Sequence, residues 1–233
     1  LSADVKGYSV LMSDDEIHTI ETLKAYRKII SDLISRRSGR VVDSPGDNIL
    51  AEFRSVVDAI KCAAEIQKQL KQENEQHADD KKVQFRIGVN IGDVIQDGDR
   101  IYGNGVNVAA RIEGLADPGG VSISRNAFGQ IKDKLTFGYE YQGEHEVKNI
   151  KDPIKVYKVL MADEDAGKLV GEKSRSTQKN GLHWLLLQSL FLLALLFGNF
   201  TMKKLPPLKQ HLWKKWYFHY QINLLSLFCH LKT

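Results

Sequence analysis

Cysteine is nearly absent from this 233-residue chain, which holds only Cys62 and Cys229. Cys62 falls in a helical pattern and Cys229 in the C-terminal tail, so a disulfide framework and a cysteine-based metal cluster are both excluded. This composition fits a reducing compartment. The sequence also lacks an initiating methionine and a signal peptide, and Leu1 lies inside an apolar segment. We therefore expect the sequence to be a fragment that is cut at its start.

Acidic residues are absent from residues 201–233, which contain six lysines. The whole chain has a net charge of +4, so removing these six positive charges leaves residues 1–200 with a net charge of −2. A protein that binds nucleic acid needs a basic surface to contact phosphates. The main part of the chain has no such excess of positive charge, and we expect no nucleic-acid partner.

Apolar periodicity predicts alternating strands and helices over the first 160 residues. Helices are predicted at residues 13–38, 56–70, 106–115 and 125–132. Strands are predicted at residues 1–8, 40–53 (a hairpin), 83–91, 94–96, 121–123, 139–147 and 154–159. Hairpins among the connections indicate an α+β fold, and the first six elements follow the βαββαβ order of the ferredoxin-like arrangement.

The predicted hairpin at residues 40–53 carries an acidic residue at its tip. Pro45 fixes its own φ, and Gly46 allows a backbone angle that other residues avoid, so Asp47 is presented on a tight turn. An acidic residue at such a place most often serves only to stabilise the turn. Farther along, Asn107 and Arg111 are four residues apart on a predicted helix and therefore share a face, a pattern that is also typical of a solvated helix.

These residues belong to a series of five short motifs that follow one another along the chain. They are DVKGYS at residues 4–9, GD at 46–47, FRIGVNIGD at 85–93, IYGNGVNVAAR at 101–111 and VKNI at 147–150. Together, over about residues 1–160, they resemble the catalytic domain of class III adenylate/guanylate cyclases. The resemblance implies an enzyme that joins the 3′-hydroxyl of ATP or GTP to its own α-phosphate and expels pyrophosphate.

The resemblance also implies a role for each matching residue. Asp4 and Asp47 match the two metal-binding aspartates, which hold two Mg²⁺ or Mn²⁺ ions per site. Asn107 matches the asparagine that orients the ribose, Arg111 the arginine that stabilises transition-state charge, and Lys148 a lysine that binds phosphate. In this family the site lies between two domains arranged head to tail. Because one domain here carries all these residues, we expect a homodimer with two equivalent sites.

Two positions depart from the family pattern, both where adenylate cyclases read the purine. Asp43 replaces the expected lysine, and Arg100 replaces the expected aspartate. Asp43 can accept from guanine while Arg100 donates to its O6, or Asp43 can accept from the N6 amino group of adenine. Alternatively, the two residues pair with each other and leave a weakly active or inactive site. We favour ATP because it is the commoner substrate in the family.

A second class of function is a regulatory module that dimerises and binds nucleotide without turning it over. A module of this kind has no need of both metal-binding carboxylates. The presence of Asp4 and Asp47 together with Asn107 and Arg111 therefore favours an active enzyme.

The sequence changes character after residue 160. Residues 161–181 are polar without periodicity, which predicts a linker. Residues 182–200 are mainly Leu, Phe, Ala and Trp, which predicts a single transmembrane helix, although a buried core helix has a similar composition. Basic residues before this segment favour a cytoplasmic catalytic domain at the inner membrane.

The basic tail at residues 201–233 has no helical or strand periodicity. From His211 onward its codons, read one nucleotide upstream, permit the sequence ASVEKMVFPLPDKPSIAVLP. This string resembles the segment that follows the membrane helix in many bacterial proteins with this domain. We hypothesise that the tail is an out-of-frame translation.

Overall fold

The computed structural model describes residues 1–147, 150 and 152–171. Within that part of the chain, no helix combines the length and the apolar character that crossing a membrane requires. The predicted membrane helix at residues 182–200, the tail at 201–233 and the predicted phosphate ligand Lys148 lie outside it.

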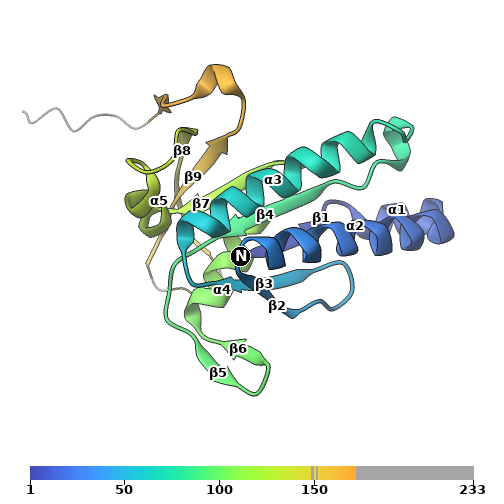
Figure 1. Cartoon of the computed structure of the whole chain (residues 1–233), viewed down its shortest axis with the longest axis horizontal. Coiled ribbons are helices and arrows are strands. Elements are labelled where there is room, and N and C mark those ends of the chain that lie inside the picture. Colours follow the sequence, from blue (N-terminus) through green and yellow to red (C-terminus); the bar gives the residue numbers. More distant parts are fainter. Residues whose placement is uncertain (148–149, 151, 172–233) are drawn as a thin grey trace, which may run out of the picture. The chain divides into compact units, whose positions relative to one another are not determined.

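The ferredoxin-like arrangement predicted from the sequence is confirmed. Its elements are β1 (Ser2–Val5), α2 (Glu16–Arg36), β2 (Gly39–Asp43), β3 (Ile49–Phe53), α3 (Val56–Asn74) and β4 (Phe85–Val89). In space these strands follow the order β4-β1-β3-β2, and β1 pairs antiparallel with both β3 and β4. This order places β1 at the centre of the first half of the sheet (Figure 1). Asp4 belongs to this strand.

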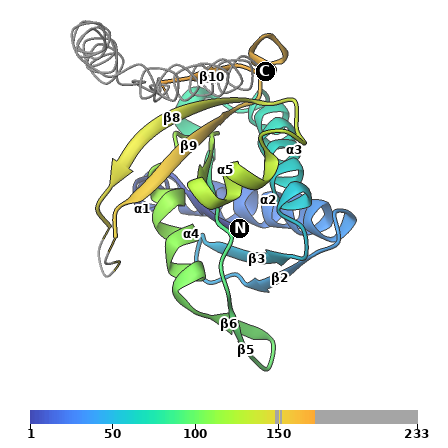
Figure 2. The same cartoon turned by 90° about the vertical axis from the view of Figure 1, so that its left-hand side faces the viewer.

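The second half extends the same sheet beyond β4. Its elements are α4 (Asn104–Gly114), β7 (Val121–Ser124), α5 (Arg125–Ile131), β8 (Gly138–His145), β9 (Ile154–Leu160) and β10 (Leu169–Val170). The full strand order is β10-β8-β9-β7-β4-β1-β3-β2, with a long antiparallel β8–β9 pair (Figure 2). A separate hairpin of β5 (Ile95–Asp97) and β6 (Arg100–Tyr102) projects from this sheet (Figure 1).

Three boundaries differ from the prediction. The first strand ends at Val5 rather than Tyr8, because Gly7 takes a φ of 71° and starts the short helix α1 (Tyr8–Asp14). Arg100, which lies outside the predicted strands, belongs to β6. Within the predicted linker at 161–181, β10 pairs with β8 in parallel, and residues 163–165 form a 3₁₀ turn.

The two faces of the sheet are covered by different helices. On β4, Phe85, Ile87 and Val89 are buried in the core that includes side chains of α2 and α3. Gly88 points the other way, because alternate strand residues face opposite sides, and there it meets α4. A Cβ on Gly88 would lie 2.3 Å from the carbonyl oxygen of Ala109, so α4 rests directly on this glycine.

We expect Gly88→Ala to destabilise the domain by about 3 kcal/mol. The added methyl would also lie 2.3 Å from the backbone nitrogen of Glu113, and backbone atoms cannot rotate away. Thermal unfolding measures the effect. Gly114→Ala on the same helix is the matched control, because a Cβ there meets nothing within 4 Å. Equal stability of the two variants would show that α4 does not pack on β4 in this way.

Candidate active site

Asp4 lies on the α4 side of β1. Its neighbours Ala3 and Val5 are buried in the core on the other side, and alternation turns the Asp4 carboxylate toward the face that α4 covers. Nη2 of Arg86, directly across on β4, donates to Oδ2 of Asp4 at 2.7 Å. The Asp4 side chain is 24% exposed. One acid is thus fixed on a central strand and accessible from one side.

Asp47 lies in the turn between β2 and β3, as predicted, and the turn closes on itself. The backbone N–H of Asn48 donates to the carbonyl of Pro45 at 3.0 Å. The hydroxyl of Ser44 donates to the carbonyl of Asn48 at 3.2 Å. Gly46 takes a φ of 56°, which only glycine adopts at low cost. This geometry presents the Asp47 carboxyl toward β1.

The fold brings Asp4 and Asp47 together from positions 43 residues apart in the sequence. Burial, and then the adjacent Asp4 carboxyl with which it forms a hydrogen bond, raise the pKa of Asp47 to about 6. Two acids that share a site in this way repel each other when both are ionised. A cation between them would remove that repulsion.

The donor set fits a divalent cation that also binds phosphate. Among the described residues, no group of three or more His, Cys, Asp or Glu side chains could hold a metal ion. Mg²⁺ typically takes only one or two carboxylates and completes its shell with water and substrate phosphates. The Asp4–Asp47 pair provides that number of carboxylates.

Two further charged residues, Glu113 and Arg86, lie beside this pair, and neither was assigned a role from the sequence. Glu113 of α4 is only 5% exposed; it accepts from the hydroxyl of Ser2 at 3.3 Å and pairs with Arg86 at 3.4 Å. Burial and the nearby Asp4 raise the pKa of Glu113 to about 7, although Arg86 and Ser2 oppose this. The only sequence signal was an arginine inside the apolar strand at residues 83–91.

Asn107 and Arg111 share a face of α4, as predicted. Both are exposed, whereas Ala109, Ile112 and Glu113 form the buried face of the helix. In the described part of the chain, no hydrogen bond or ion pair joins Asn107 or Arg111 to Asp4 or Asp47. One chain therefore does not bring all four residues into contact.

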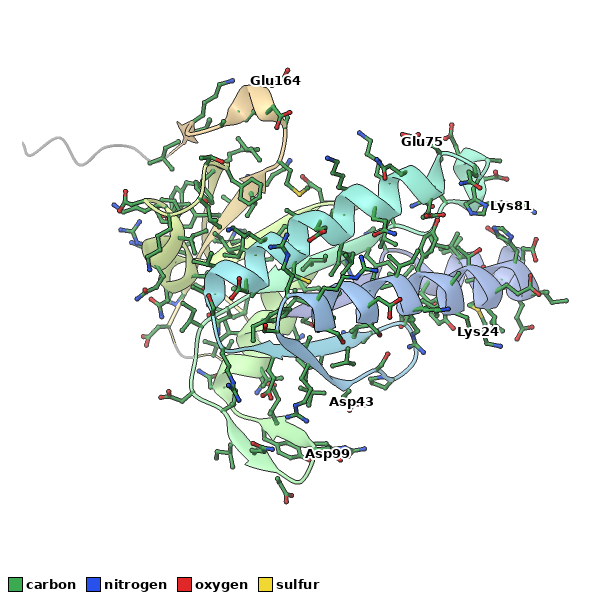
Figure 3. The ribbon with its side chains drawn as sticks, in the orientation of Figure 1. Lys24, Asp43, Glu75, Lys81, Asp99 and Glu164 are labelled. Carbon is green, nitrogen blue, oxygen red and sulfur yellow. The ribbon has the colours of Figure 1, made fainter. Side chains whose placement is uncertain are left out.

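The two purine-reading candidates lie on neighbouring hairpins. Asp43 ends β2, and its Oδ1 accepts from the N–H of Ser44 at 2.9 Å. Arg100 is exposed on β6, and no ion pair between it and Asp43 occurs among the described residues. Arg40 of β2 joins the hairpins by donating to the carbonyl of Asp99 at 3.0 Å. Figure 3 labels Asp43 on the first of these hairpins and Asp99 on the second. Asp43 and Arg100 therefore do not form an ion pair with each other in the part of the chain that the structure describes.

Comparison with known proteins identifies the family of the chain. A model of the adenylate and guanylate cyclase catalytic domain matches residues 1–161. The protein named "Putative adenylate cyclase 3" of Rhizobium meliloti (strain 1021) is 40% identical over 158 residues, which make up 67% of this chain and 27% of that protein. The chain thus spans about a quarter of this relative.

Solved structures agree in fold. An adenylate/guanylate cyclase/hydrolase from Silicibacter pomeroyi is 36% identical with a TM-score of 0.63, covering 68% of this chain and 93% of that one. The catalytic core of a rhodopsin-guanylyl cyclase with converted specificity, solved with ATPαS, is 23% identical with a TM-score of 0.60, covering 68% and 92%. At that identity the second likeness shows the fold alone. With the family model matching more than half of its length, the chain belongs to the adenylate and guanylate cyclase catalytic domain family.

Proposed function

We propose that this protein is an adenylate cyclase, which converts ATP to 3′,5′-cyclic AMP and pyrophosphate for intracellular signalling. The observation that carries the proposal is the meeting of Asp4 and Asp47 on the face of the sheet that α4 covers. Cyclisation displaces pyrophosphate from the α-phosphorus by in-line attack of the 3′-oxygen. Such a displacement needs positive charge near the attacking and leaving oxygens.

Asp4 and Asp47 are the residues that would hold two Mg²⁺ or Mn²⁺ ions. When bound, these ions would neutralise the phosphates and favour ionisation of the 3′-hydroxyl. The protein holds its two acids in place beforehand: Arg86 contacts Asp4, and the N–H of Val5 donates to Asp47. Fixing the acids in advance avoids the cost of reorganising them during the reaction.

A second copy of the chain would complete the site. The exposed positions of Asn107 and Arg111 support this, because both are available to a partner's substrate. The β5–β6 hairpin adds an exposed apolar surface, with Ile95 71% and Tyr102 48% exposed. Exposed apolar side chains of this kind favour protein–protein contact. We therefore propose a homodimer with two equivalent sites.

In this dimer, each residue from the second copy acts on one part of the nucleotide. Asn107 would orient the ribose, so that the 3′-oxygen faces the α-phosphorus. Arg111 would donate to the phosphate oxygens, where negative charge grows in the transition state. Lys148 would bind the same phosphates. Asp43 and Arg100 would contact the base.

The choice of ATP leads to a test at Asp43. Because Oδ1 of Asp43 is already held by the N–H of Ser44, Oδ2 remains to accept from the N6 amino group of adenine. A lysine at this position would donate to N1 of adenine and meet the N1–H donor of guanine. We expect Asp43→Lys to increase the ATP-to-GTP ratio of kcat/KM by about tenfold, the value of one well-placed hydrogen bond. An unchanged ratio would remove Asp43 from base recognition.

The proposed reaction is tested by supplying the full chain with Mn²⁺ and either ATP or GTP, and by separating the products. We expect cyclic AMP and pyrophosphate in equal amounts. Cyclic GMP alone would assign guanylate cyclase activity. No cyclic product from either nucleotide would refute the enzyme and leave the nucleotide-binding dimerisation module.

Attachment to the inner membrane, with the catalytic domain in the cytoplasm, stays a proposal based on sequence. It is supported by the apolar composition of residues 182–200 and by Lys173, Arg175 and Lys179 before them.

A further inference from the structure

Arg27 contacts the turn that carries Asp47 from the side of α2. Nη2 of Arg27 donates to the carbonyl oxygen of Ser44 at 3.1 Å and also to that of Gly46. These two carbonyls flank Pro45, and Asp47 is the next residue in the chain. Among the described residues, Arg27 forms no ion pair with a carboxylate. Its guanidinium is therefore directed at the backbone of the turn.

The turn has few other attachments to the rest of the domain. Its bonds from Asn48 to Pro45 and from Ser44 to Asn48 are internal. On the β1 side, the amide of Asn48 donates to the hydroxyl of Ser2 at a long 3.4 Å, and the N–H of Val5 donates to the Asp47 side chain. Pro45 and Gly46 themselves are exposed. On the α2 side, Arg27 thus fixes a segment that solvent would otherwise leave free to move.

We propose that Arg27 is a positioning residue for the metal site, holding the turn so that Asp47 faces Asp4 before a cation binds. The proposal rests on the metal role of these two acids in the proposed function. A ligand that is already in place loses little conformational entropy on binding. Residues that support metal ligands in this way are typically worth about 10–100-fold in metal affinity.

The position of Arg27 separates this role from a general one in folding. The core contacts of α2 come from its buried side chains, among them Tyr26, Ile30 and Leu33. Arg27 is only half-buried, and its Nε is enclosed without a partner among the described residues. The contacts with Ser44 and Gly46 are its polar contacts there. Removing the side chain should therefore loosen the turn and leave the helix in place.

The test compares Arg27→Ala and Arg27→Lys with Arg36→Ala, an exposed arginine on the same helix, all in the full chain. The Mn²⁺ concentration for half-maximal cyclase activity is measured at saturating ATP, and Mn²⁺ binding without ATP is followed by electron paramagnetic resonance. Arg27→Ala is expected to need about 10–100-fold more Mn²⁺ in both measurements. Its kcat at saturating Mn²⁺ should stay within about threefold of the wild type. Lysine keeps a donor and should recover part of the affinity, whereas Arg36→Ala should match the wild type.

The two measurements separate this inference from the proposed function. Unchanged Mn²⁺ binding by an active Arg27→Ala variant would overturn the positioning role alone. A loss of kcat with unchanged Mn²⁺ dependence would also overturn it. If the wild type made no cyclic nucleotide while Arg27→Ala still weakened Mn²⁺ binding, the positioning role would hold and the cyclase function would fail.

Discussion

Replacing Asp47 by asparagine is expected to lower cyclase activity by at least about a thousandfold. Metal-assisted charge stabilisation is worth several kcal/mol in such displacements, and each 1.36 kcal/mol corresponds to about tenfold in rate. Asparagine has the same shape, so the turn should keep its bonds between Asn48, Pro45 and Ser44. The exposed Asp133, changed to asparagine, is the control for loss of one charge.

The same substitution should stabilise the metal-free protein. Burial and the Asp4 carboxyl raise the pKa of Asp47 from 3.8 to about 6. An acid whose pKa is higher in the folded state opposes folding when ionised, so this cost is absent below about pH 4 and complete above about pH 6. We expect Asp47→Asn to gain about 1 kcal/mol at pH 7.5, less than the full shift implies because the turn is partly open to solvent.

The effect of Mn²⁺ on the unfolding temperature is a second measurement on the Asp47→Asn variant. A cation that binds only the folded state raises the unfolding temperature. The wild type should therefore be stabilised by Mn²⁺, and Asp47→Asn should not. Activity within tenfold of the wild type, or an unchanged response to Mn²⁺, would show that Asp47 is not a metal ligand.

Replacing Arg111 by alanine is expected to reduce kcat by about 100- to 1,000-fold, the usual effect of removing one donor to transition-state charge. The KM for ATP should change far less, because this contact strengthens only as the reaction proceeds. Since Arg111 is exposed on α4, the unfolding temperature should stay close to that of the wild type. Steady-state kinetics and thermal unfolding measure both quantities.

Arg36→Ala is again the control, because it removes an exposed arginine from α2 rather than from α4. A rise in KM with unchanged kcat would assign Arg111 to ground-state binding instead. A large loss of stability would indicate a structural role within α4.

The overall fold was predictable because its signals are local. Alternation and helical spacing located the strands around β1 and β4 and the helices α2 and α3. Helical spacing does not give burial at every position: Ile17 fits the apolar spacing of α2, yet it is 73% exposed. A periodic pattern shows which residues share a face, but it does not show where that face extends beyond the sheet.

The candidate site was predictable only where a motif marked it. Asp4, Asp47, Asn107 and Arg111 stand in such motifs, and the first two lie beside each other in the folded chain. Glu113 gave no signal, because its partners Ser2 and Arg86 come from strands distant in the sequence.

The contacts of Arg27 were hidden for a similar reason. They are with backbone carbonyls of the β2–β3 turn, which no side-chain pattern can reveal. Hydrogen bonds of this kind depend on how α2 lies beside β2, and only the folded chain shows that arrangement.

A cyclase site shared between two copies of this chain can be tested by combining two inactive variants. Asp47→Asn and Arg111→Ala chains would be co-expressed with different tags, and the doubly tagged heterodimer assayed with ATP and Mn²⁺. Such a dimer has one site with both defects and one with neither. We expect about half the activity of the wild-type dimer. A heterodimer as inactive as either parent would show that the site is not shared between two copies.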